Sequence, residues 1–156
     1  MSGRVVASRR TDEDWTFNDS SAVKQTQSIW DALAAGDPGP GDRSFIGSLV
    51  FDNGPGAGPW RHTEGMAEYI EMISGFYPLF GDTFRQEGTC VFANEQFTIT
   101  LVSELGVHAT SGDAFDNRAI YVNRIGADGK VDHIWTVDLD SEDMESFWRK
   151  NPVEKT

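Results

Sequence analysis

The chain has 156 residues, and its 13 lysines and arginines against 25 aspartates and glutamates give a formal net charge of −12 at pH 7. Such a charge repels the phosphates of nucleic acids and anionic membrane surfaces, so neither is an expected partner. The length suits one domain with a substantial core and is too short for two.

The first segment, residues 1–18, mixes charged residues with few apolar ones. We predict a flexible N-terminal arm there, followed by a single domain over residues 19–150. The arm lacks the apolar core of a signal peptide, and no apolar run approaches the roughly 20 residues that span a bilayer. We therefore expect a cytoplasmic protein.

The first predicted helix covers Asp19 to Ala35, where apolar residues recur at helical spacing between a serine or aspartate cap and Gly36. Prolines and glycines then break the chain at residues 37–42, and residues 45–51 are typical of a short strand.

A second glycine-rich segment follows at residues 53–59, and we interpret it either as a lid or as a surface connection. The second predicted helix covers residues 64–76, and its apolar stripe continues to Phe80. Most of that stripe is expected in the core.

From Phe84 the pattern changes to a period of two, which predicts four consecutive strands and a short final helix. The strands are expected at residues 84–92, 96–105 (extending towards 109), 118–125 and 131–139, and the helix at 142–148. Helices followed by long antiparallel strands indicate an α+β fold, with a curved antiparallel sheet wrapped around the N-terminal helices. Such a sheet leaves a cone-shaped cavity for a small molecule.

The segment Asp116 to Ile125, followed by the turn Asp128-Gly129-Lys130, resembles the SnoaL-like polyketide cyclases. These belong to the nuclear-transport-factor-2-like (ketosteroid isomerase-like) superfamily, and the resemblance runs from about Ala22 to Trp148. It implies the cone-shaped fold and frequent pairing into homodimers through the outer face of the sheet. Relatives include cyclases, isomerases, dehydratases, epoxide hydrolases and proteins without catalysis, so the fold alone does not decide the reaction.

The resemblance implies an acid on the last strand, but the matching position holds Thr136. Asp138 lies two residues further on and points to the same face as Thr136. If this face looks into the cavity, Asp138 is the available carboxylate, and aromatic surroundings would raise its pKa towards that of a general base or acid. The alternative is that Asp138 only caps the final helix.

His108 and Glu104 are the further catalytic candidates, four residues apart on one face of the same predicted strand. They form either an acid and base pair or a polar edge. A mostly aromatic set of residues, with polar groups able to bind an oxygen, is expected to bind the substrate. Its members are Trp30, Phe51, Trp60, His62, Tyr69, Phe76, Phe80, Asn117, Tyr121 and Thr136.

No metal or cofactor is expected, because the three histidines are too scattered for a zinc site and no glycine-rich phosphate loop opens a helix. The first hypothesis is a cofactor-independent cyclase or isomerase that moves protons on a hydrophobic, oxygenated secondary-metabolite intermediate. The alternatives are an epoxide hydrolase of the limonene-epoxide-hydrolase type and a non-catalytic module for ligand binding or dimerisation. A homodimer is expected in each case.

Overall fold

The computed structural model describes residues 2–7 and 45–153. These residues form one sheet, two α-helices and three short 3₁₀ helices. In chain order they are β1 Ser2–Ala7, β2 Phe45–Asp52, η2 Pro55–Ala57, β3 His62–Glu64, α3 Gly65–Phe76, η3 Tyr77–Leu79, η4 Gly81–Thr83, β4 Arg85–Ala93, β5 Phe97–Val107, β6 Ala114–Ile125, β7 Val131–Asp138 and α4 Ser141–Lys150.

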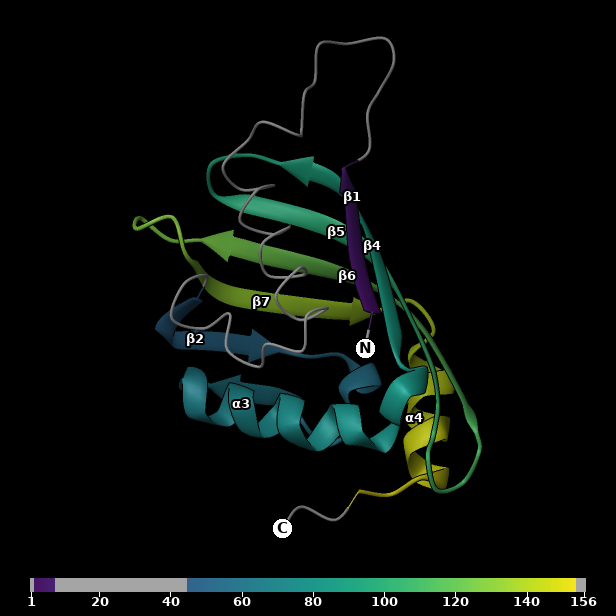
Figure 1. Cartoon of the computed structure of the whole chain (residues 1–156). Coiled ribbons are helices and arrows are strands. Elements are labelled where there is room, and N and C mark those ends of the chain that lie inside the picture. Colours follow the sequence, from purple (N-terminus) through teal and green to yellow (C-terminus); the bar gives the residue numbers. More distant parts are fainter. Residues whose placement is uncertain (1, 8–44, 154–156) are drawn as a thin grey trace, which may run out of the picture.

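The sheet has the strand order β1-β4-β5-β6-β7-β2-β3 and is strongly curved and unclosed (Figure 1). Strands β4 to β7 pair antiparallel, as predicted. The sheet as a whole is mixed, which corrects the prediction of an antiparallel sheet, because β1 pairs parallel with β4 and β2 pairs parallel with β7. Neither parallel pair is consecutive in the chain, so no tight hairpin imposes the antiparallel direction on it.

The N-terminal segment departs from its prediction as a flexible arm. Residues 2–7 form β1, which covers the edge of β4. The β-branched pair Val5 and Val6 favours an extended strand, and an open sheet edge offers unpaired backbone groups to such a strand. The remainder of the predicted arm and the predicted helix over residues 19–35 lie outside the described residues.

The other predicted elements are confirmed, with shifted ends. Strand β6 begins at Ala114, earlier than predicted, and the short strand β3 was not predicted. The hairpin between β6 and β7 closes with a hydrogen bond from the backbone nitrogen of Gly126 to the oxygen of Lys130. Gly129 in this turn has a φ of 76°, a conformation that glycine adopts without steric cost.

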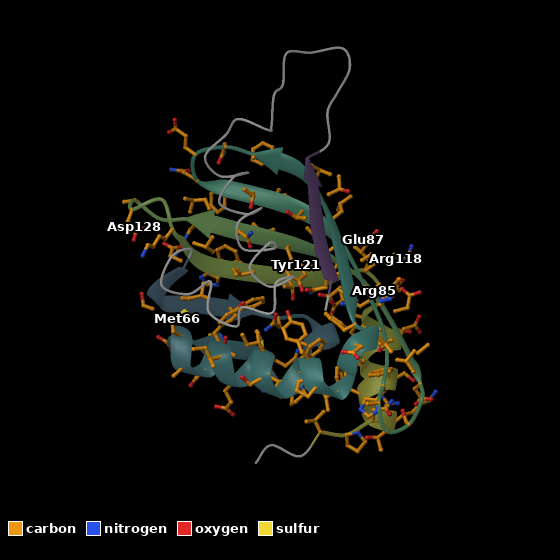
Figure 2. The ribbon with its side chains drawn as sticks, viewed as in Figure 1. Met66, Arg85, Glu87, Arg118, Tyr121 and Asp128 are labelled. Carbon is orange, nitrogen blue, oxygen red and sulfur yellow. The ribbon has the colours of Figure 1, made fainter. Side chains whose placement is uncertain are left out.

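Helix α3 covers β2 on the inner side of the curved sheet, and α4 lies near the far end of α3 (Figure 1). One buried cluster joins α3 to the sheet and includes Leu49, Phe51, Tyr69, Ile73 and Ile134. A second cluster packs α4 against the sheet end through Phe80, Phe84, Phe115, Met144 and Phe147. The side chain of Tyr121 points into the space between the sheet and α3, whereas Arg85, Glu87 and Arg118 lie outside (Figure 2).

Among the described residues, no helix combines the length and apolarity needed to cross a membrane.

Candidate active site

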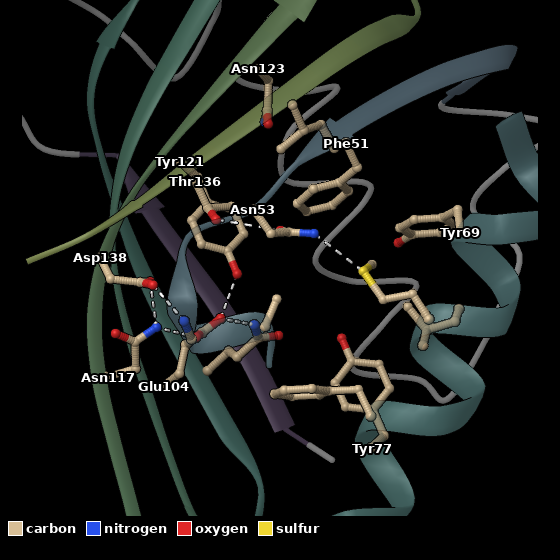
Figure 3. A pocket seen from close by; sticks show the side chains of 17 residues that line it. Phe51, Asn53, Tyr69, Tyr77, Glu104, Asn117, Tyr121, Asn123, Thr136 and Asp138 are labelled. Atoms are coloured by element: carbon tan, nitrogen blue, oxygen red, sulfur yellow. Dashed lines mark hydrogen bonds between the residues drawn. The ribbon is translucent and has the colours of Figure 1, made fainter. Parts of the chain in front are cut away.

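A cavity of about 80 Å³ lies between α3 and the inner face of the sheet (Figure 3). Ile134, Thr136 and Asp138 of β7 line it, so this face of the strand looks into the cavity, the first of the two alternatives that the sequence left open. Seventeen residues line the cavity: Phe51, Asn53, Gly56, Ala57, Tyr69, Met72, Ile73, Phe76, Tyr77, Gln86, Glu104, Asn117, Tyr121, Asn123, Ile134, Thr136 and Asp138.

Asp138 is 6% exposed and accepts two hydrogen bonds. Its Oδ1 accepts from Nδ2 of Asn117 at 2.9 Å, and its Oδ2 accepts from the backbone nitrogen of Gly56 at 2.5 Å. The strand pairing explains this placement, because Asp138 pairs with Ala119 of β6 and Asn117 lies two residues before Ala119 on the same face.

Glu104 lies beside Asp138 and accepts three hydrogen bonds. Its Oε1 accepts from the hydroxyl of Tyr121 at 2.5 Å and from Nε2 of Gln86 at 2.6 Å, and its Oε2 accepts from Nδ2 of Asn117 at 2.9 Å. Burial raises the pKa of Glu104, and the charge of Asp138 acts in the same direction, while the three hydrogen bonds oppose the rise. We call Gln86, Glu104, Asn117, Tyr121 and Asp138 the polar end of the cavity.

The glycine-rich segment after β2 closes over the polar end, which favours the lid over the surface connection among the two sequence interpretations. The backbone nitrogen of Gly54 donates to the hydroxyl oxygen of Thr136 at 2.9 Å. A Cβ atom on Gly54 would overlap with the Asp138 carboxylate, and one on Gly56 would overlap with the Asn117 amide. Only glycine permits so close an approach of the backbone to the acid.

The Tyr77 hydroxyl is directed into the cavity and has no hydrogen-bond partner among the described residues (Figure 3). Burial, together with Tyr69 and Glu104, raises the pKa of Tyr77 well above its ordinary value near 10. Burial likewise raises the pKa of Tyr121. Both phenols therefore keep their protons near neutral pH and can donate hydrogen bonds to an oxygen atom.

The rest of the wall is apolar and comes mainly from α3 and β2. Phe51 stacks on Tyr69 with ring centroids 6.0 Å apart, and Phe76 closes the side towards the second core cluster. No lysine, arginine or histidine belongs to the described lining. The volume is about half of the roughly 150 Å³ in which a cavity binds benzene, so a ligand with a ring enters only in part or displaces part of the wall.

His108 does not join this site. It lies at the end of β5, and its ring packs at 6.1 Å from both Phe80 and Phe147. Its Nδ1 accepts from the backbone nitrogen of Ser111 at 3.3 Å. His108 and Glu104, predicted as a possible pair, are thus separated, because the strand ends between them: β5 stops at Val107 and His108 starts the following turn.

The expected substrate-binding residues fall into three groups. Phe51, Tyr69, Phe76, Asn117, Tyr121 and Thr136 line the cavity. Trp60 and Phe80 are buried but outside the described lining, and Trp30 lies outside the described residues. His62 is exposed on β3, where its Nδ1 lies 2.6 Å from Oδ1 of Asp52.

Asp52 also joins His62 to His133 on the outer face of the sheet, since its Oδ2 lies 2.7 Å from Nε2 of His133. The hydrogen bond from His62 lowers the pKa of Asp52, and the same bond raises the pKa of His62. The ring of His133 stacks on Trp135 at 3.7 Å. His133 is also absent from the described lining of the cavity.

Four polar lining residues were not predicted from the sequence: Asn53, Tyr77, Gln86 and Asn123. Gln86 could have been predicted, because both β4 and β5 were expected from the sequence and Gln86 pairs directly with Glu104 across them. Tyr77 follows the last turn of α3 in a 3₁₀ helix, and its apolar neighbours concealed it within a core stripe.

No family model matches the sequence, and no curated protein matches it. Solved structures do. An NTF2-like protein of unknown function from Burkholderia pseudomallei K96243 superposes with a TM-score of 0.68 at 14% identity, over 86% of this chain and 99% of that one. The chain has the nuclear-transport-factor-2-like fold.

Two further solved structures carry names that refer to a reaction. A candidate SnoaL-like polyketide cyclase from Jannaschia sp. CCS1 has a TM-score of 0.68 at 13% identity, over 85% of this chain and 94% of that one. IdmH, a candidate polyketide cyclase from Streptomyces antibioticus, has a TM-score of 0.60 at 15% identity, over 81% and 99%. At these identities the likeness concerns the fold.

Proposed function

We propose that this protein is a cofactor-independent enzyme that moves a proton on a hydrophobic, oxygenated small molecule, as a cyclase or isomerase does. The observation that carries the proposal is a pair of buried carboxylates, Glu104 and Asp138, joined by the amide of Asn117 at the end of an otherwise apolar cavity. Two such acids without a cation in the described lining favour retention of one proton between them. A carboxylate beside a retained proton is what general acid and base catalysis needs.

Asp138 is the proposed base. Its two hydrogen bonds hold the carboxylate in one orientation and leave a lone pair on each oxygen for a substrate proton. Asp138 would take the proton from a C–H group next to a carbonyl. In an isomerisation, the protonated Asp138 would return this proton to another carbon of the substrate. In a cyclisation, the enolate carbon would instead attack a second carbonyl of the same molecule, and the oxygen of that carbonyl would take the proton back from the Asp138 carboxyl.

The tyrosines are the proposed stabilisers of the enolate oxygen. The Tyr77 hydroxyl is directed into the cavity, has no partner in the described part of the chain, and remains protonated near neutral pH. Tyr121 donates to Glu104 while Glu104 is ionised. When Glu104 holds the retained proton, it can donate to the Tyr121 oxygen, and the Tyr121 hydroxyl can then donate to the substrate oxygen.

Epoxide opening receives less support, because it calls for a basic group beside the acid and amide groups, and the described lining has none. A purely binding role remains the alternative outcome of the test below.

The test is proton exchange in D₂O. The protein is incubated with carbonyl compounds that carry an acidic C–H bond, beginning with 2-acetylnaphthalene, and deuterium uptake is followed by mass spectrometry. Uptake faster than in buffer with the heat-denatured protein supports proton transfer. Binding by calorimetry without any enhanced uptake across the series would favour a binding module.

We further propose that two copies pair through the outer face of the sheet. Leu101, Leu105 and Val107 of β5 and Val137 of β7 are between 43% and 55% exposed there. These side chains point away from the cavity, since their strand neighbours with the opposite parity line it. An apolar face of this kind on a soluble domain favours association.

A further inference from the structure

We propose that the cavity recognises a hydroxyl group of its ligand through the side-chain oxygen of Asn123, at the end opposite to Asp138. The inference rests on the proposed function only in that the cavity takes a small-molecule ligand. It adds a second polar requirement to the ligand, remote from the reacting atoms.

Asn123 is 5% exposed, lines the cavity, and has an Oδ1 atom without a hydrogen-bond partner among the described residues. Its side chain lies apart from the polar end, on the same strand as Tyr121 and on the side of Phe51 (Figure 3). A buried oxygen without a donor carries a desolvation cost of about 1–3 kcal/mol. A donor from a bound ligand would remove this cost.

The other unpaired oxygens of the described residues have different settings. Those of Thr63 and Thr100 do not line the cavity. Asn117 uses its amide nitrogen to bridge Glu104 and Asp138, so its position has a reason within the fold. The Oδ1 atom of Asn123 differs from these, because it lines the cavity and its amide bridges no pair of carboxylates in the described part of the chain.

The strand register gives the spacing of the two ends. Asn123 pairs with Ile134, and Asp138 lies four residues further along β7. Four residues of an antiparallel strand span about 13 Å. The lining also includes Phe51 and Tyr69, whose rings suit an apolar, flat middle section of the ligand.

A ligand group that pairs with this oxygen donates a hydrogen bond, because the unpaired atom is an acceptor. A charged ammonium group is disfavoured by the apolar neighbours Phe51 and Ile134, since desolvation of a charge costs more than one hydrogen bond returns. The ligand class is therefore an elongated, apolar carbonyl compound with a hydroxyl group at its far end.

The test compares two probes, 2-acetylnaphthalene and 6-hydroxy-2-acetylnaphthalene, by isothermal titration calorimetry. For the wild-type protein we expect the hydroxyl group to tighten binding about tenfold. Leucine has a similar volume but no acceptor. Asn123→Leu should therefore bind both probes with the dissociation constant that the wild type has for 2-acetylnaphthalene. Thr100→Val, which removes an unpaired oxygen outside the cavity, should keep the full preference.

Thermal unfolding of Asn123→Leu separates a ligand-binding role from a structural one. Removal of an unpaired buried oxygen should raise the midpoint by a few degrees, whereas loss of a structural asparagine would lower it. Equal dissociation constants of the two probes for the wild type, or failure of the hydroxylated probe to bind, would overturn the inference. Turnover is not measured, so a protein without catalysis still passes or fails this test on binding alone.

Discussion

The amide nitrogen of Asn117 lies 2.9 Å from Oδ1 of Asp138, and the same nitrogen lies 2.9 Å from Oε2 of Glu104. An NH₂ group has two hydrogens, so one side chain serves both carboxylates. Asn117 thus holds two carboxyl groups close together without a cation from the described lining.

Replacement of Asn117 by leucine should lower the free energy of unfolding by about 3 kcal/mol, because two buried carboxylates lose a shared donor. Urea denaturation measures the change. The matched control is Thr100→Val, whose buried hydroxyl has no partner among the described residues and whose loss should cost little or stabilise. Equal effects of the two substitutions would contradict the bridge.

Glu104 should make stability depend on pH. Its pKa is raised in the folded protein from an ordinary value near 4.5, so the folded state binds more protons than the unfolded state above that pH. The free energy of unfolding should then fall as the pH rises from about 4.5 through the raised pKa. Glu104→Gln should flatten this fall, as measured by urea denaturation at several pH values. Parallel curves for the two proteins would refute this titration.

Gly56→Ala should slow proton exchange at least about tenfold, because the added Cβ overlaps with Asn117 and crowds Asp138. Exchange of 2-acetylnaphthalene in D₂O measures the rate. Gly126→Ala provides the control, since its Cβ would meet its nearest atoms, on the hairpin between β6 and β7, at 3.3 Å or more. An unchanged rate in Gly56→Ala would show that proton exchange does not depend on the close approach of this backbone to Asp138.

The proposed pairing of two copies through the outer face of the sheet can be tested by substitution. Leu101→Asp places a charge on this face, where the wild-type side chain is 45% exposed, and we expect it to produce monomers in sedimentation velocity. Ile70→Asp is the matched control, because Ile70 is 42% exposed on α3, outside the sheet. A monomeric wild type, or dimers in both variants, would argue against pairing through β5.

His108→Leu should leave the exchange rate within about twofold of wild type, because His108 lies outside the described lining. The substitution removes the hydrogen bond from Ser111 and changes packing against Phe80, so a loss of about 1–2 kcal/mol in stability is expected. If the exchange rate fell as much as in an Asp138 variant, His108 would have to take part in catalysis.

The sequence predicted the fold well where patterns are local. Alternation of apolar residues located β4 to β7, and the Asp128-Gly129 pair located their last hairpin. The parallel pairing of β2 with β7 could not be foreseen, because it joins segments about 80 residues apart and no local pattern encodes such a partner.

The site was predictable in part for the same reason. Parity along β7 put Asp138 and Thr136 on one face, and the structure has both in the cavity wall. Parity along β5 would also have put His108 beside Glu104, but the strand ends at Val107 and the chain turns away. The contact of Gly56 with Asp138 spans 82 residues and is visible only in three dimensions.

The most direct measurement is deuterium uptake by 2-acetylnaphthalene with the wild type and with Asp138→Asn at equal protein concentration. The amide keeps the shape of the carboxylate but cannot accept a proton near neutral pH. We expect the variant to bind the compound while its exchange rate falls about 100-fold or more, the range of a lost general base. Equal rates for the two proteins, or no uptake above buffer with the wild type, would contradict the assignment of Asp138 as the base.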